Sequence, residues 1–190
     1  LGGSCKIEKT EERAISVVQL EAVEANVERR FVAERWEGGR PDGTDAEGKP
    51  QWKTVALTPE TVNLYDADKY IIKPVTVARR CSLVEVLAAG PQPPDWFVSH
   101  FWGEPIKEFV ACIKRHSKDR LLGFDMEGKP AQPGMHTNDR YNNEYEVKAP
   151  GLYWVRSAAS SPPLPLTVAR GSRRSSSSSR PQVCAYANNQ

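Results

Sequence analysis

The residues from Ser99 to Glu104 combine side chains that can exchange protons with aromatic rings that can stack on a flat ligand. They follow the apolar run WFV, which is typical of a buried strand, and they precede a segment with the pattern of a helix. Ligands of open α/β sheets bind at the carboxyl ends of strands, beside the amino end of the next helix. We therefore predict a binding pocket formed by Ser99, His100, Trp102, Gly103 and Glu104.

In this pocket Trp102 would stack on a base, and Glu104 would accept a hydrogen bond from a ribose hydroxyl. No cofactor is predicted with certainty, but the ligand that fits these roles is NAD or a related nucleotide. A structural interpretation is also open, in which Ser99 and His100 satisfy backbone groups at the turn and Trp102 packs against the protein. A catalytic Ser99–His100 pair is excluded, because neighbouring strand residues point to opposite faces and cannot exchange a proton.

Cysteine and histidine offer one candidate metal pair, Cys112 and His116, which lie four positions apart on the expected helix. A zinc site needs a third and a fourth ligand, and none comes at a recognised spacing, so no metal site is predicted. The cysteines Cys5, Cys81, Cys112 and Cys184 are far apart and have no C-x-x-C spacing. Because the sequence shows no secretion signal, we expect four free thiols in a cytoplasmic protein.

Length and composition bound the class of protein. The 190 residues are enough for one domain with an extension, and only 39% of them are hydrophobic. The mean hydropathy of −0.57 predicts that part of the chain is solvated or disordered. A net charge of +2 gives no reason to expect a nucleic-acid or membrane partner. No apolar run approaches the roughly 18 residues that span a bilayer.

The N-terminal part is predicted to form a helix followed by a hairpin. Apolar residues at helical spacing favour an amphipathic helix over residues 11–30, although an alternation in its middle leaves a strand open. Residues 29–37 and 51–57 alternate and are rich in aromatic and β-branched side chains, so we expect them to pair as strands. The Gly- and Pro-rich residues 38–50 would form a long loop between them.

Two local signals predict helix ends in the middle of the chain. A helix is expected to stop near Lys73, because Pro74 disfavours helical geometry at the residue before it. Ser82 and Glu85 have the spacing of a capping box, which predicts the start of a short helix.

The strand that ends at His100 and the helix that begins near Pro105 would form the first half of a β-α-β unit. The apolar face of this helix is formed by Ile106, Phe109, Val110 and Ile113. Residues 123–150 are rich in Gly, Pro and Asn and are expected to be a loop. The Ser-, Pro- and Arg-rich residues 156–182 have little to bury and are expected to be disordered. A PPLP motif and an Arg/Ser run in this tract are weak signals for a polyproline ligand and for RNA contact.

The segment DWFVSHFWGEPIKEFVACIKRH, residues 95–116, resembles the first strand and helix of Toll/interleukin-1 receptor (TIR) domains. The Leu-Ser-x-x-Trp-Gly element of fungal heterokaryon-incompatibility (HET) domains is similar to Val98, Ser99, Trp102 and Gly103. A longer part, residues 28–118 and 183–190, resembles an uncharacterised protein family of dinoflagellate algae through NLYDADKYIIKP, RRCSLVEVLAAGPQPPDWFVSHFWGEP and VCAYANNQ. The resemblance implies an incomplete TIR-like (flavodoxin-like) unit.

Two departures from these families bear on function. In the algal family, a run that is similar to YWVCAYANNQ continues without a break. Here residues 156–183 separate YWV from CAYANNQ. We hypothesise a retained intron or a gene-prediction error, and a spliced transcript that carries residues 156–183 in frame would disprove it. TIR enzymes that cleave NAD use a Glu on a later helix, and no matching position is found up to Gln190.

These inferences combine into one expectation, an α/β protein in several parts. Residues 1–90 would form a helix and hairpin extension, and residues 91–155 a partial TIR/HET-like unit. A disordered insert over residues 156–182 and a stray strand over residues 183–190 would follow. The expected function is an intracellular signalling or protein-interaction module without catalysis, which binds a protein partner or itself and not a membrane. The alternative is a nucleotide-binding or NAD-cleaving TIR-like enzyme fragment.

Overall fold

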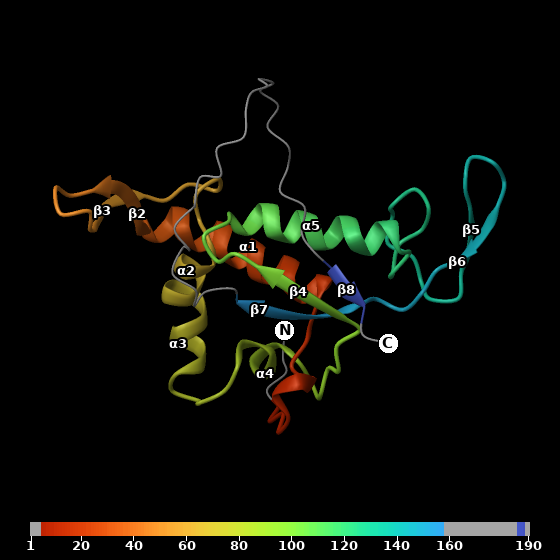
Figure 1. Ribbon diagram of the computed structural model, residues 1–190. Helices are drawn as coiled ribbons and strands as arrows, with labels where there is room; N and C mark the ends of the chain where they lie inside the picture. Colours follow the sequence, from red (N-terminus) through yellow and green to blue (C-terminus); the bar gives the residue numbers. More distant parts are fainter. Residues whose placement is uncertain (1–4, 158–185, 189–190) are drawn as a thin grey trace, which may run out of the picture.

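A small mixed sheet lies at the centre of the computed structural model, which describes residues 5–157 and 186–188 (Figure 1). The strands lie in the order β1-β7-β4-β8, with bounds Ile15–Ser16, Leu152–Ser157, Trp96–His100 and Tyr186–Asn188. The strand β7 is parallel to β4, whereas β1 and β8 pair antiparallel with their neighbours. The chain is therefore a mixed α/β protein.

The helix α5 (Ile106–Asp119) connects β4 to the parallel strand β7, which completes a β-α-β unit. The predicted strand and helix are both confirmed, and Pro105 is the last residue before the helix. The predicted apolar face of α5 is buried in the core, as Ile106, Phe109, Val110 and Ile113 show.

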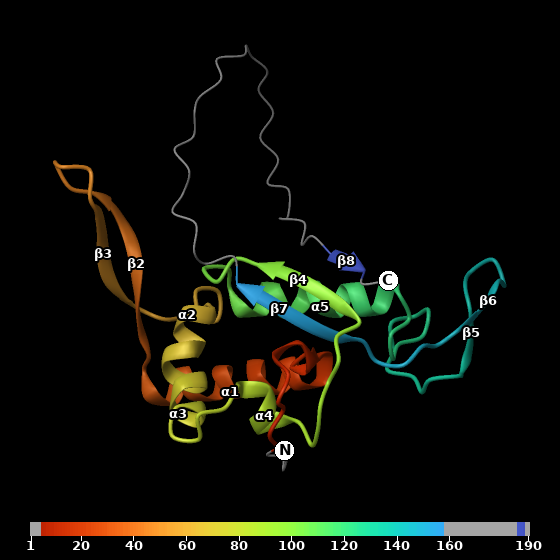
Figure 2. The ribbon, with the colours of Figure 1, turned by 60° about the horizontal axis from the view of Figure 1, so that its bottom comes forward.

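The helix α1 (Val17–Glu34) lies beside α5 and packs against it (Figure 2). The helix predicted over residues 11–30 is confirmed from Val17 onward. Before it, the chain forms a short 3₁₀ turn, η1 (Thr10–Glu12), and the strand β1. A reciprocal capping box between Ser16 and Gln19 fixes the start of α1, because each side chain accepts a hydrogen bond from the other residue's backbone N–H.

A second helical layer contains α2 (Leu64–Ala67), the π-helical turn η2 (Asp68–Ile72) and α3 (Lys73–Thr76). The prediction that the helix stops near Lys73 is wrong, because α3 includes Pro74. In the π turn Lys73 donates to the carbonyl of Asp68, five residues earlier. This wider turn relieves the clash that a proline ring makes with the preceding turn of a regular helix.

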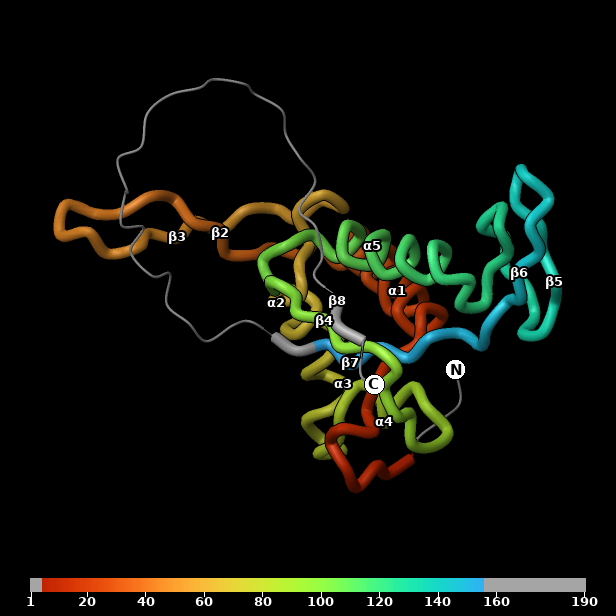
Figure 3. Tube along the Cα trace, turned by 45° about the vertical axis from the view of Figure 1, so that its right-hand side comes forward, coloured from red at the N-terminus to blue at the C-terminus, as the bar shows by residue number. Residues whose placement is uncertain are grey.

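The short helix α4 (Leu83–Leu87) begins at the predicted capping box, which is confirmed. Glu85 also holds the N-terminal segment beside α4 (Figure 3): its side chain accepts from the backbone N–H of Ile7 at 2.9 Å, and its carbonyl accepts from Cys5 at 3.0 Å. The bonds that the carboxylate accepts from the backbone N–H groups of Ile7 and Ser82 lower the pKa of Glu85 to about 2.

A long two-stranded hairpin, β2 (Glu37–Thr44) and β3 (Pro50–Ala56), projects from the body next to α2 (Figures 1 and 2). The predicted positions of these strands are partly wrong, because residues 29–34 continue α1 and most of the predicted loop 38–50 forms β2. Residues 29–34 are helical because α1 packs against the core, and residues 38–44 are extended because they pair with β3.

A second, smaller hairpin projects at the opposite end of the molecule (Figure 1). It consists of β5 (His136–Asn138) and β6 (Glu144–Glu146), so residues 123–150 are not entirely loop as predicted. Predictions for residues 158–185 lie outside the described part of the chain. Within the stray segment 183–190, residues 186–188 form β8 along one edge of β4.

The same five-residue turn occurs three times, over Asp45–Lys49, Asp125–Lys129 and Asp139–Asn143. The first residue of each turn is an aspartate whose side chain accepts from the backbone N–H of the fifth residue, at 2.7, 2.8 and 2.9 Å respectively. The fourth residue has a φ of 79°, 76° or 66°, in the left-handed region that glycine and asparagine tolerate: Gly48, Gly128 and Asn142. Two of these turns close the tips of the projecting hairpins.

Candidate functional site

His100 is the last residue of β4, and its imidazole is buried in the core with a side-chain exposure of 1%. The ring is stacked at a tilt on Phe109 of α5, with 4.1 Å between the ring centroids. Its Nδ1 atom lies 2.9 Å from Oε2 of Glu104. Neither ring nitrogen makes a hydrogen bond of acceptable geometry within the described residues. His100 is therefore a buried polar group that the protein leaves unsatisfied.

Burial disfavours the charged forms of both His100 and Glu104. It lowers the pKa of His100 to about 4, so the imidazole is neutral at pH 7. Burial also raises the pKa of Glu104, and the nearby Glu108 carboxylate raises it further. The short distance alone would indicate an ion pair, but a ring without hydrogen bonds gains too little to hold its proton. The pair is thus a neutral imidazole beside a largely buried carboxyl.

The other predicted pocket residues lie around this pair but do not converge on it. Ser99 is exposed, on the side of the strand opposite His100. The indole of Trp102 packs edge to face against Tyr65 at 5.5 Å, which matches the structural interpretation of this residue. A Cβ on Gly103 would lie 2.4 Å from the ring of Phe101, so a larger residue there would displace this exposed ring.

The segment before α2 covers the amino end of α5. The backbone N–H of Ile106 donates to the carbonyl of Val62 at 2.9 Å, and Leu64 N–H donates to the carbonyl of Trp102 at 3.1 Å. These bonds occupy one of the free helix N–H groups that a phosphate would need. The predicted pocket residues thus include a buried acid–base pair, and the helix end beside them is partly covered.

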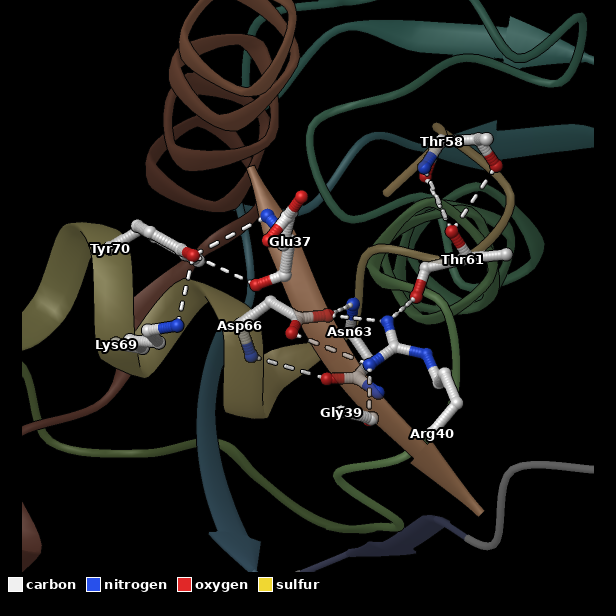
Figure 4. Close-up of polar contacts among 9 residues, drawn as sticks. All are labelled: Glu37, Gly39, Arg40, Thr58, Thr61, Asn63, Asp66, Lys69 and Tyr70. Atoms are coloured by element: carbon white, nitrogen blue, oxygen red, sulfur yellow. Dashed lines mark hydrogen bonds and ion pairs between the residues drawn. The ribbon is translucent and has the colours of Figure 1, made fainter. Parts of the chain in front are cut away.

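An ion pair that the sequence did not indicate fastens the long hairpin to the body (Figure 4). Arg40 of β2 reaches Asp66 of α2, with 2.6 Å between Nη2 and Oδ2, and also donates to the carbonyl of Thr61. Asp66 accepts from the backbone N–H of Asn63 at 3.1 Å, and its side chain is only 6% exposed. A Cβ on Gly38 would lie 2.5 Å from the same carboxylate, so this position needs glycine.

A ring contact supports the same junction. The indole of Trp36 is buried and stacks on Tyr70 with 4.4 Å between centroids. The hydroxyl of Tyr70 donates to the carbonyl of Glu37 at 2.8 Å, at the first residue of β2 (Figure 4). The base of the hairpin is therefore fixed by polar and aromatic contacts, whereas among the described residues its outer half makes such contacts only within the hairpin.

A buried polar cluster between α5 and β7 is structural. The hydroxyl of Tyr153 lies 2.7 Å from Ser117 Oγ and 3.0 Å from His116 Nδ1, and all three side chains are buried. Burial lowers the pKa of His116 and raises that of Tyr153. Cys112 takes part in a disulfide, whereas Cys5 and Cys81 are free thiols, so the prediction of four free thiols is wrong at Cys112.

The described residues contain no group of three His, Cys, Asp or Glu side chains placed to hold a metal ion. Within the same part of the chain, no helix combines the length and the apolar character needed to cross a membrane. Comparison of the chain with protein-family models, curated proteins and solved structures finds no match in any of the three.

Proposed function

We propose that this protein is a protein-interaction module of intracellular signalling, that it has no catalytic activity, and that it associates with a second copy of itself through the long hairpin. The observation that carries the proposal is the exposed face of β2 and β3. Trp52 of β3 is 66% exposed and lies opposite Pro41 of β2. Trp is among the residue types that contribute most to protein interfaces.

The two faces of the hairpin differ in charge. On one face Arg40 pairs with Asp66, and Lys53 pairs with Asp42 at 2.7 Å. The opposite face is formed by uncharged exposed residues, with Glu37 only at its base: Gly39, Pro41, Trp52 and Thr54. Beyond Glu37 this face has no charge, so its outer part can meet its own copy without repulsion, as a two-fold symmetric interface requires. An isolated two-stranded hairpin is also only marginally stable in water, so a covering partner would stabilise it.

Sedimentation velocity at increasing protein concentration tests self-association. We expect the weight-average mass to rise toward that of a dimer, and Trp52→Ser to weaken the dimer about tenfold or more. Val18→Ser is the matched control, because Val18 is 64% exposed but lies in the first turn of α1, whereas the hairpin follows the last turn of that helix. A protein that stays monomeric at every concentration, or a dimer that Trp52→Ser leaves unchanged, would overturn the proposal.

A nucleotide-binding or NAD-cleaving enzyme is the second candidate, and the buried pair of His100 and Glu104 favours it. Incubation with NAD, with nicotinamide release as the readout, separates the two functions. Release that is abolished by Glu104→Ala and kept in Glu108→Ala would establish the enzyme. A rise in melting temperature with NAD or ADP-ribose without turnover would indicate binding alone.

The resemblance of residues 95–116 to TIR and HET domains supports the signalling role, because the resemblance implies action by self-association. The cytoplasm remains the predicted compartment. Free thiols at Cys5 and Cys81 support it, whereas the disulfide at Cys112 does not.

A further inference from the structure

The small hairpin has one paired strand edge and one open edge. Val147 N–H donates to the carbonyl of Met135 at 2.8 Å, and Asp139 N–H donates to the carbonyl of Asn143 at 3.0 Å. Residues 143, 145 and 147 therefore turn their backbone groups toward β5. Because successive strand residues point these groups to opposite sides, the outward-facing residues are Glu144, Glu146 and Lys148.

The outward edge is paired at only one of these positions. Lys148 N–H donates to the carbonyl of Leu121 at 2.8 Å, and its carbonyl accepts from Gly123 at 2.9 Å. These bonds form a parallel bridge between Leu122 and Lys148. At the next outward position, Glu146, no strand or bridge pairs with this edge within residues 5–157 and 186–188. The pairing stops because α5 ends at Asp119, and the chain before Leu121 belongs to that helix.

A hollow of about 300 Å³ lies where the missing neighbour of Glu146 would be. It is lined by Asp119, Arg120, Leu121, Tyr145, Glu146 and Lys148. Its size is at the lower end of the range for ligand sites. Tyr145 is 41% exposed there. An open strand edge and a hollow of this size therefore coincide.

Three of the four charged side chains that line the hollow have no ion pair among the described residues, whereas Asp119 pairs with Arg115 at 3.6 Å. Glu146 and Lys148 form no ion pair among the described residues, and Arg120 contacts only the ring of Trp96, at 5.5 Å from its centroid. Glu144 pairs only with His136, an exposed contact of 3.1 Å. Carboxylates thus line the open edge, and two cations lie at its closed end together with Asp119.

We propose that the outer edge of β6 binds an extended peptide, which adds as a third strand to the β5–β6 sheet. The peptide carries a basic side chain beside Glu144 and Glu146 and a carboxylate near Arg120 and Lys148. A second copy of β6 does not fit this edge, because antiparallel pairing about Tyr145 places Glu144 opposite Glu146 twice. This site lies on the other hairpin from the proposed dimer face, so it goes beyond the proposed function.

Fluorescence anisotropy with the full chain tests the proposal. The probes are a fluorescein-labelled peptide Thr-Lys-Val-Lys-Val-Glu and the peptide of reversed sequence, because the structure allows either strand direction. We expect saturable binding of one of them. Glu146→Pro removes an outward N–H without touching the bonds to β5 and should raise the Kd about tenfold. Glu146→Gln keeps that N–H and should have the smaller effect.

Methylation of the peptide amides tests the pairing without any change to the protein, so a folding defect of a variant cannot affect the result. In strand addition only alternate amides of the peptide face β6, so N-methylation of one alternate set should abolish binding and methylation of the other should not. Trp52→Ser should leave the Kd unchanged, which separates this site from the dimer face. Absence of saturable binding for both probes, or equal binding of both methylated peptides, would overturn the proposal.

Discussion

His100 is buried without the hydrogen bonds that usually offset the burial of a polar ring, and this gives the protein a defined sensitivity to acid. The pKa of His100 is about 4 in the folded state, against 6.5 for an ordinary histidine. Between these values the unfolded chain binds a proton that the folded chain does not, so stability falls as the pH falls from 6.5 to 4. The loss from this residue is about 3 kcal/mol.

Urea unfolding of the wild type and of His100→Gln at pH 7 and pH 4 measures this loss. The wild type should lose about 3 kcal/mol more than the variant, which has no titrating ring. Two carboxyls change the stability of both proteins between pH 7 and pH 4. The lowered pKa of Glu85 adds to the loss of stability in acid, and the raised pKa of Glu104 opposes this loss. Parallel pH dependence in the two proteins would show that His100 is not buried in its neutral form.

Contacts between individual residues could be predicted from the sequence where the two residues are close together in the chain. Ser82 and Glu85 are three residues apart, so their capping box could be predicted from spacing alone. The ion pair of Arg40 and Asp66 joins residues 26 positions apart, and Arg40 lies in a Gly- and Pro-rich stretch that has no strand pattern. Rules based on the spacing of nearby residues do not predict a contact between residues so far apart in the sequence.

At the scale of elements, a partly buried ion pair is the main polar link between the long hairpin and the body. Arg40→Ala would leave the Asp66 carboxylate buried without its partner, which costs about 3 kcal/mol. Hydrogen exchange should then increase in β2 and β3 far more than in β4 and α5. Lys53→Ala is the control, because its exposed pair with Asp42 is worth less than about 1 kcal/mol. Uniform exchange changes across all elements would contradict this role.

Two element predictions failed for physical reasons that can be named. Pro74 was expected to end a helix, but a π turn just before it makes room for the proline ring. Residues 38–50 look like a loop because Gly and Pro are frequent, yet cross-strand pairing forms β2 there. Both outcomes depend on neighbours in space that a single segment does not reveal.

At the scale of the whole molecule, β7 and β8 lie on opposite sides of β4, with residues 158–185 between them in the chain. Neighbouring strands are about 4.8 Å apart, so a chain joined directly from Ser157 to Tyr186 cannot cross β4 and reverse direction. Deletion of residues 158–185 should therefore remove β8 from the sheet and increase hydrogen exchange at β4.

A ten-residue Gly/Ser linker in place of residues 158–185 is the control for that deletion. It should restore the protection of the β4 amides, because it can span the two strand positions. Unchanged protection in the direct deletion would mean that β8 does not contribute to the sheet edge. The β4–α5 unit was predictable from its alternating and helical patterns, but the order of strands around it was not, since it joins distant segments.

The turn that occurs three times has a consequence for the order of folding. Each copy is closed by bonds between residues at most four positions apart, so it needs no other part of the chain. Hairpins of this kind form within about 10 μs. The central sheet instead brings together segments such as Ile15 and Tyr153, whose loop closure is slow. The projecting hairpins are thus expected to form transiently before the core, and to become stable only when the core that carries them has formed.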